Sequence, residues 1–173
     1  MTTMSAPAAE PATSPPRRVD TSFQGRVFPP GEPFQVGRES LRAFAAAVGA
    51  ESPEHRDVDA ARAAGYADLV APPTYAVVIA QRCEATYVSD PASGIDFSRV
   101  VHAEEKFIHH RPIVAGDEVI GTVYVDRVRQ MGGHAMVTTR TELALADRTP
   151  VATVVSSLVV RGDDDESANE EGA

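Results

Sequence analysis

The stretch PPTYAVVIAQRCEATYV, residues 72–88, decides the fold of this chain. A helix cannot continue through Pro72 and Pro73, but it can begin directly after them, because the fixed φ of proline suits a first turn. From Thr74 onward the sequence predicts a helix of about 14 residues, roughly 20 Å long. The first half of this helix is apolar on nearly every side, which is typical of a helix enclosed by other elements.

After a turn-rich stretch at residues 89–94, the hydrophobic pattern changes to the two-residue period of strands. Four strands are predicted, at residues 100–109, 118–130, 134–146 and 151–161, with turns at 115–117, 131–133 and 147–150. These three short connections predict antiparallel neighbours. A long apolar helix and an antiparallel sheet bury both apolar faces if the sheet wraps around the helix. We therefore expect an α+β protein with the hotdog fold.

The segment before the long helix predicts smaller elements. Residues 34–36 have the pattern of a short strand, and residues 39–48 that of an amphipathic helix stopped by Gly49. A second, shorter helix is expected at residues 57–64, with Asp57 as its N-cap and Gly65 as its end. These helices lie between the short strand and the long helix in the chain.

The composition predicts one folded domain with two disordered ends. A chain of 173 residues suits a single domain. Residues 1–22 are rich in Pro, Ala, Ser and Thr, and the tail at 162–173 is acidic, so neither end buries enough apolar surface to offset the entropy of ordering. The expected domain therefore runs from residue 23 to residue 161.

Charge and cysteine content exclude several classes of function. A net charge of −9 and a pI near 5.0 argue against a nucleic-acid partner, which requires clustered Lys and Arg. Cys83 is the single cysteine, so disulfides within the chain and thiolate metal cages are excluded, and a cytoplasmic location is expected. No apolar run reaches the length of a membrane span. Adjacent His109 and His110 should point to opposite faces of a strand, so we expect neither a metal nor a cofactor.

Two stretches carry a resemblance to a known family. The run AVGAESPEHRDVDAARAAGYADLVAPPTY, residues 47–75, resembles the MaoC-like dehydratase and (R)-specific enoyl-thioester hydratase family, whose signature is G-D-x-N-P-[apolar]-H-x-D. The run FIHHRPIVAGDEVIGTVYVDRVRQ, residues 107–130, resembles the same family's F-x-x-P-[apolar]-x-x-G-D segment. The chain looks most like the actinobacterial HadA-like subunits of (3R)-hydroxyacyl-thioester dehydratases. The resemblance therefore implies a separate, catalytic HadB-like partner chain.

The resemblance implies an active site from which half of a catalytic pair is missing. The family's Asp and His act as acid and base in removing water from a 3-hydroxyacyl thioester. The His matches His55, whereas the Asp matches Ala50, which has no titratable group. Glu51, one position further on, is the candidate that could replace the Asp. Alternatively, His55 is a loop histidine hydrogen-bonded near Glu54 or Asp57.

Three more residues are candidates for substrate binding. The free N–H groups near Thr74 and Tyr75, at the start of the long helix, can stabilise negative charge on a thioester oxygen. Val78 can line an acyl channel, although a core role explains it equally well. Arg111 can meet the phosphate of a pantetheine carrier or simply be solvated, and Asp117 is explained by turn chemistry.

The leading hypothesis is a non-catalytic or weakly active dehydratase subunit of fatty-acid synthesis that supplies a channel wall to a HadB-like partner. Two alternatives stay open: a self-sufficient hydratase that uses His55 with Glu51, and a non-catalytic acyl-thioester binding protein. A hotdog thioesterase is weaker, because Glu84 comes too late in the long helix. The sequence leaves open the acyl length, the choice between acyl carrier protein and CoA, and the choice between homodimer and heterodimer.

Overall fold

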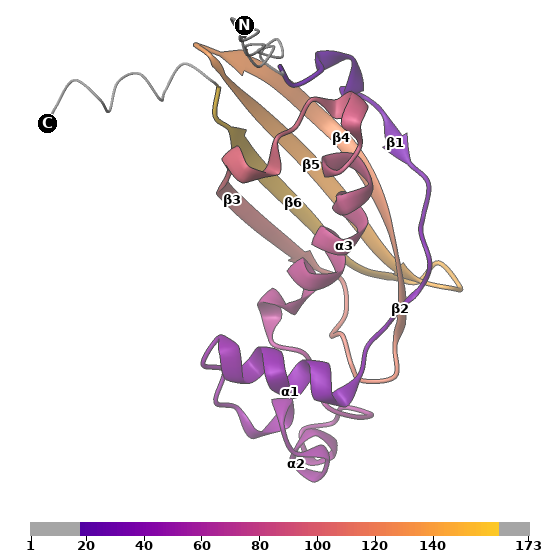
Figure 1. The fold of residues 1–173 in the computed structure, drawn as a ribbon. Helices are drawn as coiled ribbons and strands as arrows, with labels where there is room; N and C mark the ends of the chain where they lie inside the picture. Colours follow the sequence, from indigo (N-terminus) through magenta and orange to yellow (C-terminus); the bar gives the residue numbers. More distant parts are fainter. Residues whose placement is uncertain (1–17, 163–173) are drawn as a thin grey trace, which may run out of the picture.

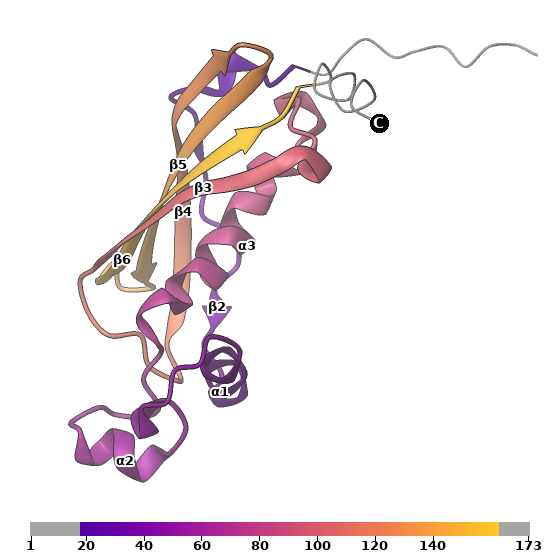
Figure 2. The same ribbon diagram turned by 90° about the vertical axis from the view of Figure 1, so that its left-hand side faces the viewer.

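A long helix lies along one face of a strongly twisted antiparallel sheet (Figure 1). The structure is a computed structural model that describes residues 18–162. Turning the molecule by 90° shows helix α3 packed on the concave side of the sheet, with α1 and α2 beyond the end at which α3 begins (Figure 2). The main elements in chain order are β1 (Val27–Phe28), β2 (Phe34–Gln35), α1 (Arg38–Ala47), α2 (Val58–Ala63), α3 (Ala76–Val88), β3 (Val100–His109), β4 (Glu118–Met131), β5 (His134–Leu145) and β6 (Pro150–Val160).

The prolines start the long helix as the sequence predicts. A 3-10 turn, Pro73–Tyr75, leads directly into α3. Ala76, Ile79 and Ala80 in the first half of α3 are fully buried. The prediction of an enclosed helix at this position is therefore confirmed, and with it the α+β hotdog architecture.

The sheet has the order β1-β4-β5-β6-β3, with the short β2 also paired to β4. The four long strands lie where the two-residue period predicts them, each within about one residue of the expected ends. In β4, the buried positions Val119, Val123 and Val125 alternate with half-buried ones, as the pattern requires.

The expected pairing of the first two long strands is wrong. β3 pairs with β6 instead of β4, so it forms the far edge of the sheet. The connection at residues 110–117 is no tight hairpin: Val70 and Val114 form a β-bridge, and Ala71 N–H donates to Ile113 O at 2.8 Å. Because this connection pairs with residues 69–71, the chain passes across the end of the sheet before it enters β4.

The core consists of two apolar clusters separated by a polar layer. One cluster surrounds the start of α3 and includes Leu41, Leu69, Tyr75 and Ile79. The other surrounds its end and includes Phe23, Tyr87, Val137 and Leu158. Buried polar side chains lie in between, and they are Glu84, Thr139, Thr141 and Ser156. The helix thus carries one buried carboxyl group toward the middle of the sheet.

The ordered body starts earlier than the sequence predicts. Val19 is buried in the second cluster, and Asp20 N–H donates to Ser93 O at 2.8 Å, so residues 18–22 are ordered and the expected boundary at residue 23 is corrected. Gln130 Nε2 also donates to Val19 O at 2.8 Å, and Asp20 caps the 3-10 turn Thr21–Phe23, although the local composition is poor in apolar groups. The rest of the expected disordered ends, residues 1–17 and 163–173, lies outside the described residues.

Candidate active site

A pocket of about 540 Å³ opens where three segments far apart in the sequence meet. The 3-10 turn Pro53–His55 forms one side, the residues leading into α3 form the base, and the end of β3 with the residues after it forms the other side. The lining residues are Glu54, His55, Tyr66, Val70, Ala71, Pro72, Pro73, His109, His110, Arg111, Pro112 and Ile113. The two stretches that resemble the MaoC-like family thus come together in one cavity.

His55 is held in one orientation at this pocket. Its side chain is 9% exposed, and Nδ1 lies 2.8 Å from the carbonyl oxygen of Val70. A carbonyl oxygen only accepts, so Nδ1 carries the proton, and in the neutral ring Nε2 keeps its lone pair. Val70 N–H in turn donates to Glu54 O at 3.2 Å. The Val70 carbonyl therefore sets the tautomer of the imidazole, and Nε2 is the ring nitrogen that can act as a base.

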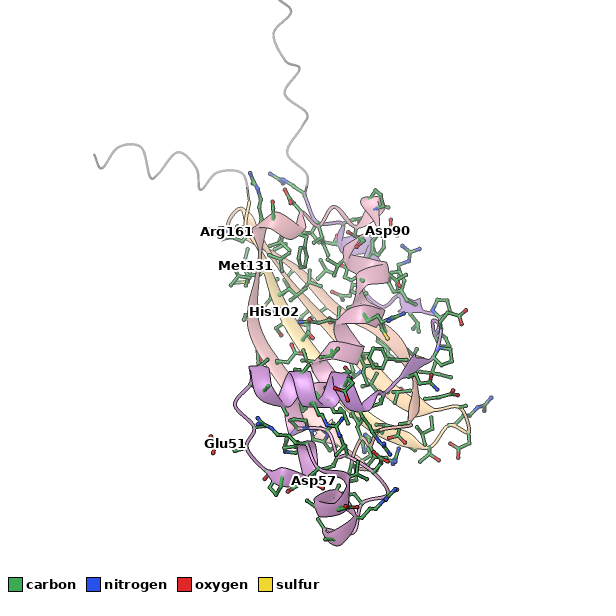
Figure 3. All side chains as sticks on the ribbon, turned by 60° about the horizontal axis from the view of Figure 1, so that its bottom comes forward. Glu51, Asp57, Asp90, His102, Met131 and Arg161 are labelled. Atoms are coloured by element: carbon green, nitrogen blue, oxygen red, sulfur yellow. The ribbon has the colours of Figure 1, made fainter. Side chains whose placement is uncertain are left out.

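The loop that carries the missing acid keeps an ordered backbone. Ala50 is half-buried; its N–H donates to Ala45 O at 2.8 Å, and its carbonyl accepts from Arg56 Nη2 at 3.0 Å. Glu51 is exposed and projects outward from the loop (Figure 3). It has no hydrogen bond or ion pair with residues 18–162 and does not line the pocket. The structure therefore does not bring Glu51 to His55.

The three residues expected to bind substrate are not gathered at this pocket. Tyr75 is fully buried, with its hydroxyl 2.7 Å from Ser40 Oγ and its ring edge-on to Phe44. Its N–H donates to Pro72 O at 2.9 Å, so the expectation of a free donor at Tyr75 is wrong: the 3-10 turn uses it. Thr74 is exposed, and its N–H has no acceptor among the described residues. Val78 is half-buried and lines a different groove.

Arg111 belongs to the pocket wall, which the sequence indicated only weakly. Its Nη1 and Nη2 donate to the carboxylate of Asp117 at 3.0 and 3.2 Å. The same carboxylate accepts from Val114 N–H at 2.9 Å. The turn aspartate therefore does more than shape a turn, because it fixes a guanidinium beside the cavity. The feature of the sequence that could have indicated this ion pair is the spacing of Arg111-Pro112 and Gly116-Asp117 in the segment that resembles the family.

His109 and His110 both line the pocket, but their rings lie on different sides of the strand end, as expected: the His109 ring stacks on that of Phe107, with centroids 6.2 Å apart. β3 ends at His109, and His110 contacts Thr153, the strand partner of Ile108, so His110 lies on the side that carries Ile108. Its Nε2 lies 3.2 Å from Thr153 Oγ1. Within residues 18–162, no group of three or more His, Cys, Asp or Glu side chains is arranged to hold a metal ion.

A second groove, of about 510 Å³, runs along α3 beside β3 and contains Val78, Glu84 and His102. Burial raises the pKa of Glu84, and hydrogen bonds from Thr139, Ser156 and Thr141 oppose that rise. The Thr139 hydroxyl donates to Glu84 Oε1 at 2.7 Å. This carboxyl group is separate from the His55 pocket, since neither lines the other's cavity.

The fold and the His55 pocket define the class as a MaoC-like hotdog dehydratase domain. The model of the FAS1-like dehydratase domain region matches residues 22–154, and the chain belongs to this family. It is 50% identical over 146 residues to a UPF0336 protein of Clavibacter michiganensis, covering 84% of this chain and 98% of that one. A UPF0336 protein of Saccharopolyspora erythraea is 46% identical over 144 residues, covering 83% and 92%.

Solved structures agree with this assignment. A MaoC-like dehydratase superimposes with a TM-score of 0.76 at 31% identity, over 83% of this chain and 44% of that chain, so the present chain spans less than half of that protein. The HadBC (3R-hydroxyacyl-ACP dehydratase) complex of Mycobacterium tuberculosis gives a TM-score of 0.69 at 28% identity, over 79% and 96%. In the part of the chain that is described, no helix is long and apolar enough to cross a membrane.

Proposed function

We propose that this chain is a subunit of a cytoplasmic (3R)-hydroxyacyl-thioester dehydratase of fatty-acid synthesis, with little or no activity of its own. The observation that carries the proposal is the combination of a preserved pocket and a lost acid. His55 retains a base nitrogen with a set tautomer, while Ala50 stands where the related enzymes have their aspartate. A HadB-like partner chain supplies a complete acid and base.

The chemistry explains why loss of the aspartate is severe. Elimination of water requires a base for the C2 proton, an acid for the departing hydroxyl, and donors for the thioester oxygen. Positioned acid or base groups contribute roughly 100-fold to 10,000-fold in rate. His55 can fill the first role. For the third we propose the N–H of Thr74, which has no acceptor among residues 18–162. Val78 remains our candidate for the channel wall, in the separate groove along α3.

An assembly of two hotdog chains is consistent with the edge of this sheet. Within residues 18–162, β3 has a neighbour strand on one side only, and its Val101 and Ile108 are 49% and 42% exposed. Unpaired edge strands invite pairing with another strand. The structurally similar HadBC is described as a complex, which supports a partner for this chain without specifying it.

The test is an enoyl-thioester assay on separated components. We expect the purified chain to hydrate crotonyl-CoA slowly, and the rate per active site to rise when the chain that copurifies with it from the native host is added. The control is that partner chain assayed alone. Fast turnover by the purified chain, abolished by His55→Ala, would contradict the proposal and favour a self-sufficient hydratase.

A non-catalytic acyl-thioester binding protein is the second candidate, and Ala50 itself favours it. Such a protein binds acyl-CoA or acyl carrier protein in calorimetry but leaves the rate of every copurifying chain unchanged. The mixed assay therefore separates the two proposals.

A further inference from the structure

We propose that Glu54, and not Glu51, serves as the acid opposite His55, and that this pair gives the isolated chain its weak activity. The inference rests on the proposed dehydratase function and names a residue for it. Glu54 occupies the position before the histidine at which the related signature has an apolar residue. Among residues 18–162, it is the sole acidic residue that lines the pocket.

The backbone holds Glu54 and His55 as one rigid unit. Val70 N–H donates to Glu54 O at 3.2 Å, and Val70 O accepts from His55 Nδ1 at 2.8 Å. The turn itself is closed by Arg56 N–H and Asp57 N–H, which donate to Pro53 O at 2.9 and 2.8 Å. This turn fixes the backbone positions of Glu54 and His55 and the orientation of the imidazole, so the Glu54 side chain starts from a constant point beside His55.

The Glu54 carboxylate has no structural task that competes with catalysis. It is half-buried, yet it has no hydrogen bond or ion pair with any residue that the structure describes. Other carboxylates nearby are engaged: Asp57 caps α2, Asp68 pairs with Arg38, and Asp117 holds Arg111. Glu54 lines the pocket, and its carboxylate has no partner among residues 18–162, so this carboxylate is available to bind a substrate hydroxyl.

The reaction balances with these two groups. His55 Nε2 takes the proton from C2, and the electron pair of that C–H bond forms the C2–C3 double bond. The C3–O bond breaks, and the protonated carboxyl group of Glu54 gives its proton to the departing hydroxide, which leaves as water. One proton then passes from the imidazolium to the Glu54 carboxylate through solvent, which restores both groups.

The experiment separates the base from the acid in the full-length chain without its partner. Dehydration of (3R)-3-hydroxybutyryl-CoA requires both groups, whereas exchange of the C2 protons of butyryl-CoA in D₂O requires only the base. We expect Glu54→Gln to lower dehydration at least tenfold while C2 exchange stays within about threefold of the wild-type rate. His55→Gln should lose both reactions.

Matched variants test the rival groups. Glu51→Gln changes a carboxylate on the same loop that points to solvent, and Tyr66→Phe removes the hydroxyl of another lining residue. Loss of dehydration in either of these, with Glu54→Gln unaffected, would overturn the proposal. Loss of both reactions in Glu54→Gln would also overturn it, because that result indicates a structural role.

The experiments can disprove the role of Glu54 and the proposed subunit function independently of each other. If the wild-type chain catalyses neither reaction, the role of Glu54 is disproved, but a rate gain on adding the copurifying chain still supports the subunit function. If the chain dehydrates with Glu54 as acid and no partner raises its rate, the subunit function is disproved and the role of Glu54 stands.

Discussion

Glu84 shows how one residue can combine a structural and an electrostatic task. It is 3% exposed, and its carboxyl group lies between two apolar clusters of the core. A buried carboxyl group costs free energy mainly in its charged form, and hydroxyl donors reduce that cost. Burial accordingly raises the pKa of Glu84 above its ordinary 4.5. The folded protein therefore binds this proton more tightly than the unfolded chain does.

This difference predicts a pH-dependent stability. Between the ordinary pKa near 4.5 and the raised value, the folded state holds more protons than the unfolded state, so the free energy of unfolding falls as pH rises through that window. Glu84→Gln keeps an acceptor for Thr139 and removes the titration. We expect urea unfolding to show a smaller loss of stability with rising pH in Glu84→Gln than in the wild type. Glu104→Gln, which changes an exposed carboxylate on β3, is the control. An equal loss of stability with rising pH in Glu84→Gln and in the wild type would refute the argument.

At the scale of elements, the close approach of α3 to β4 depends on a residue without a side chain. A Cβ placed on Gly121 would meet Cys83 Sγ well inside contact distance and would lie 3.1 Å from Leu143 Cδ2. Gly121 lies in the buried part of β4, and Cys83 lies on the facing side of α3. Glycine at this strand position is therefore explained by packing, because a larger residue would collide with Cys83 unless the thiol or the helix shifted.

Overpacking of this contact should be measurable. Gly121→Ala is expected to lower the free energy of unfolding by about 1–3 kcal/mol, the usual cost of an extra methyl group in a packed core. Cys83→Ala removes the sulfur that the new methyl group meets, so the double variant should lose less than the sum of the two single variants. Urea denaturation of the wild type, the two single variants and the double variant measures the coupling free energy between Gly121 and Cys83. Additivity within about 0.5 kcal/mol would show that the two sites are independent.

For the whole molecule, β3 forms one edge of the sheet that the structure describes. Natural proteins usually protect such an edge with charges, bulges or a covering element. β3 has an irregularity between His102 and Glu104, but it still exposes Val101 and Ile108. This half-protected edge suits pairing with a second hotdog chain, which is the assembly we propose.

A single charge at this edge should weaken the assembly. Ile108→Lys places an ammonium group where the proposed partner strand would pack, so the dissociation constant should increase at least tenfold. Sedimentation velocity across a concentration series measures this. Met131→Lys is the matched control, because Met131 is 52% exposed at the end of β4, away from the β3 edge. An equal effect of both substitutions would locate the interface elsewhere.

Much of this protein was determined by its sequence alone. The ends of the strands, the start of α3 after Pro73 and the N-cap at Asp57 follow from local rules, since each depends on a few neighbouring residues. The two segments that resemble the family, and the alanine at position 50 in place of its aspartate, can also be found from the sequence, because matching the family signature requires only the order and spacing of residues. None of these features depends on where distant parts of the chain lie.

Only the tertiary structure decided which segments meet. The pairing of β3 with β6 depends on the path of residues 110–117, which the period of a strand does not contain. For the same reason, the side chains that share the pocket with His55, Glu54 and Arg111 among them, could not be selected from the sequence. Periodicity is a property of one segment, whereas a site is a property of several segments brought together by packing.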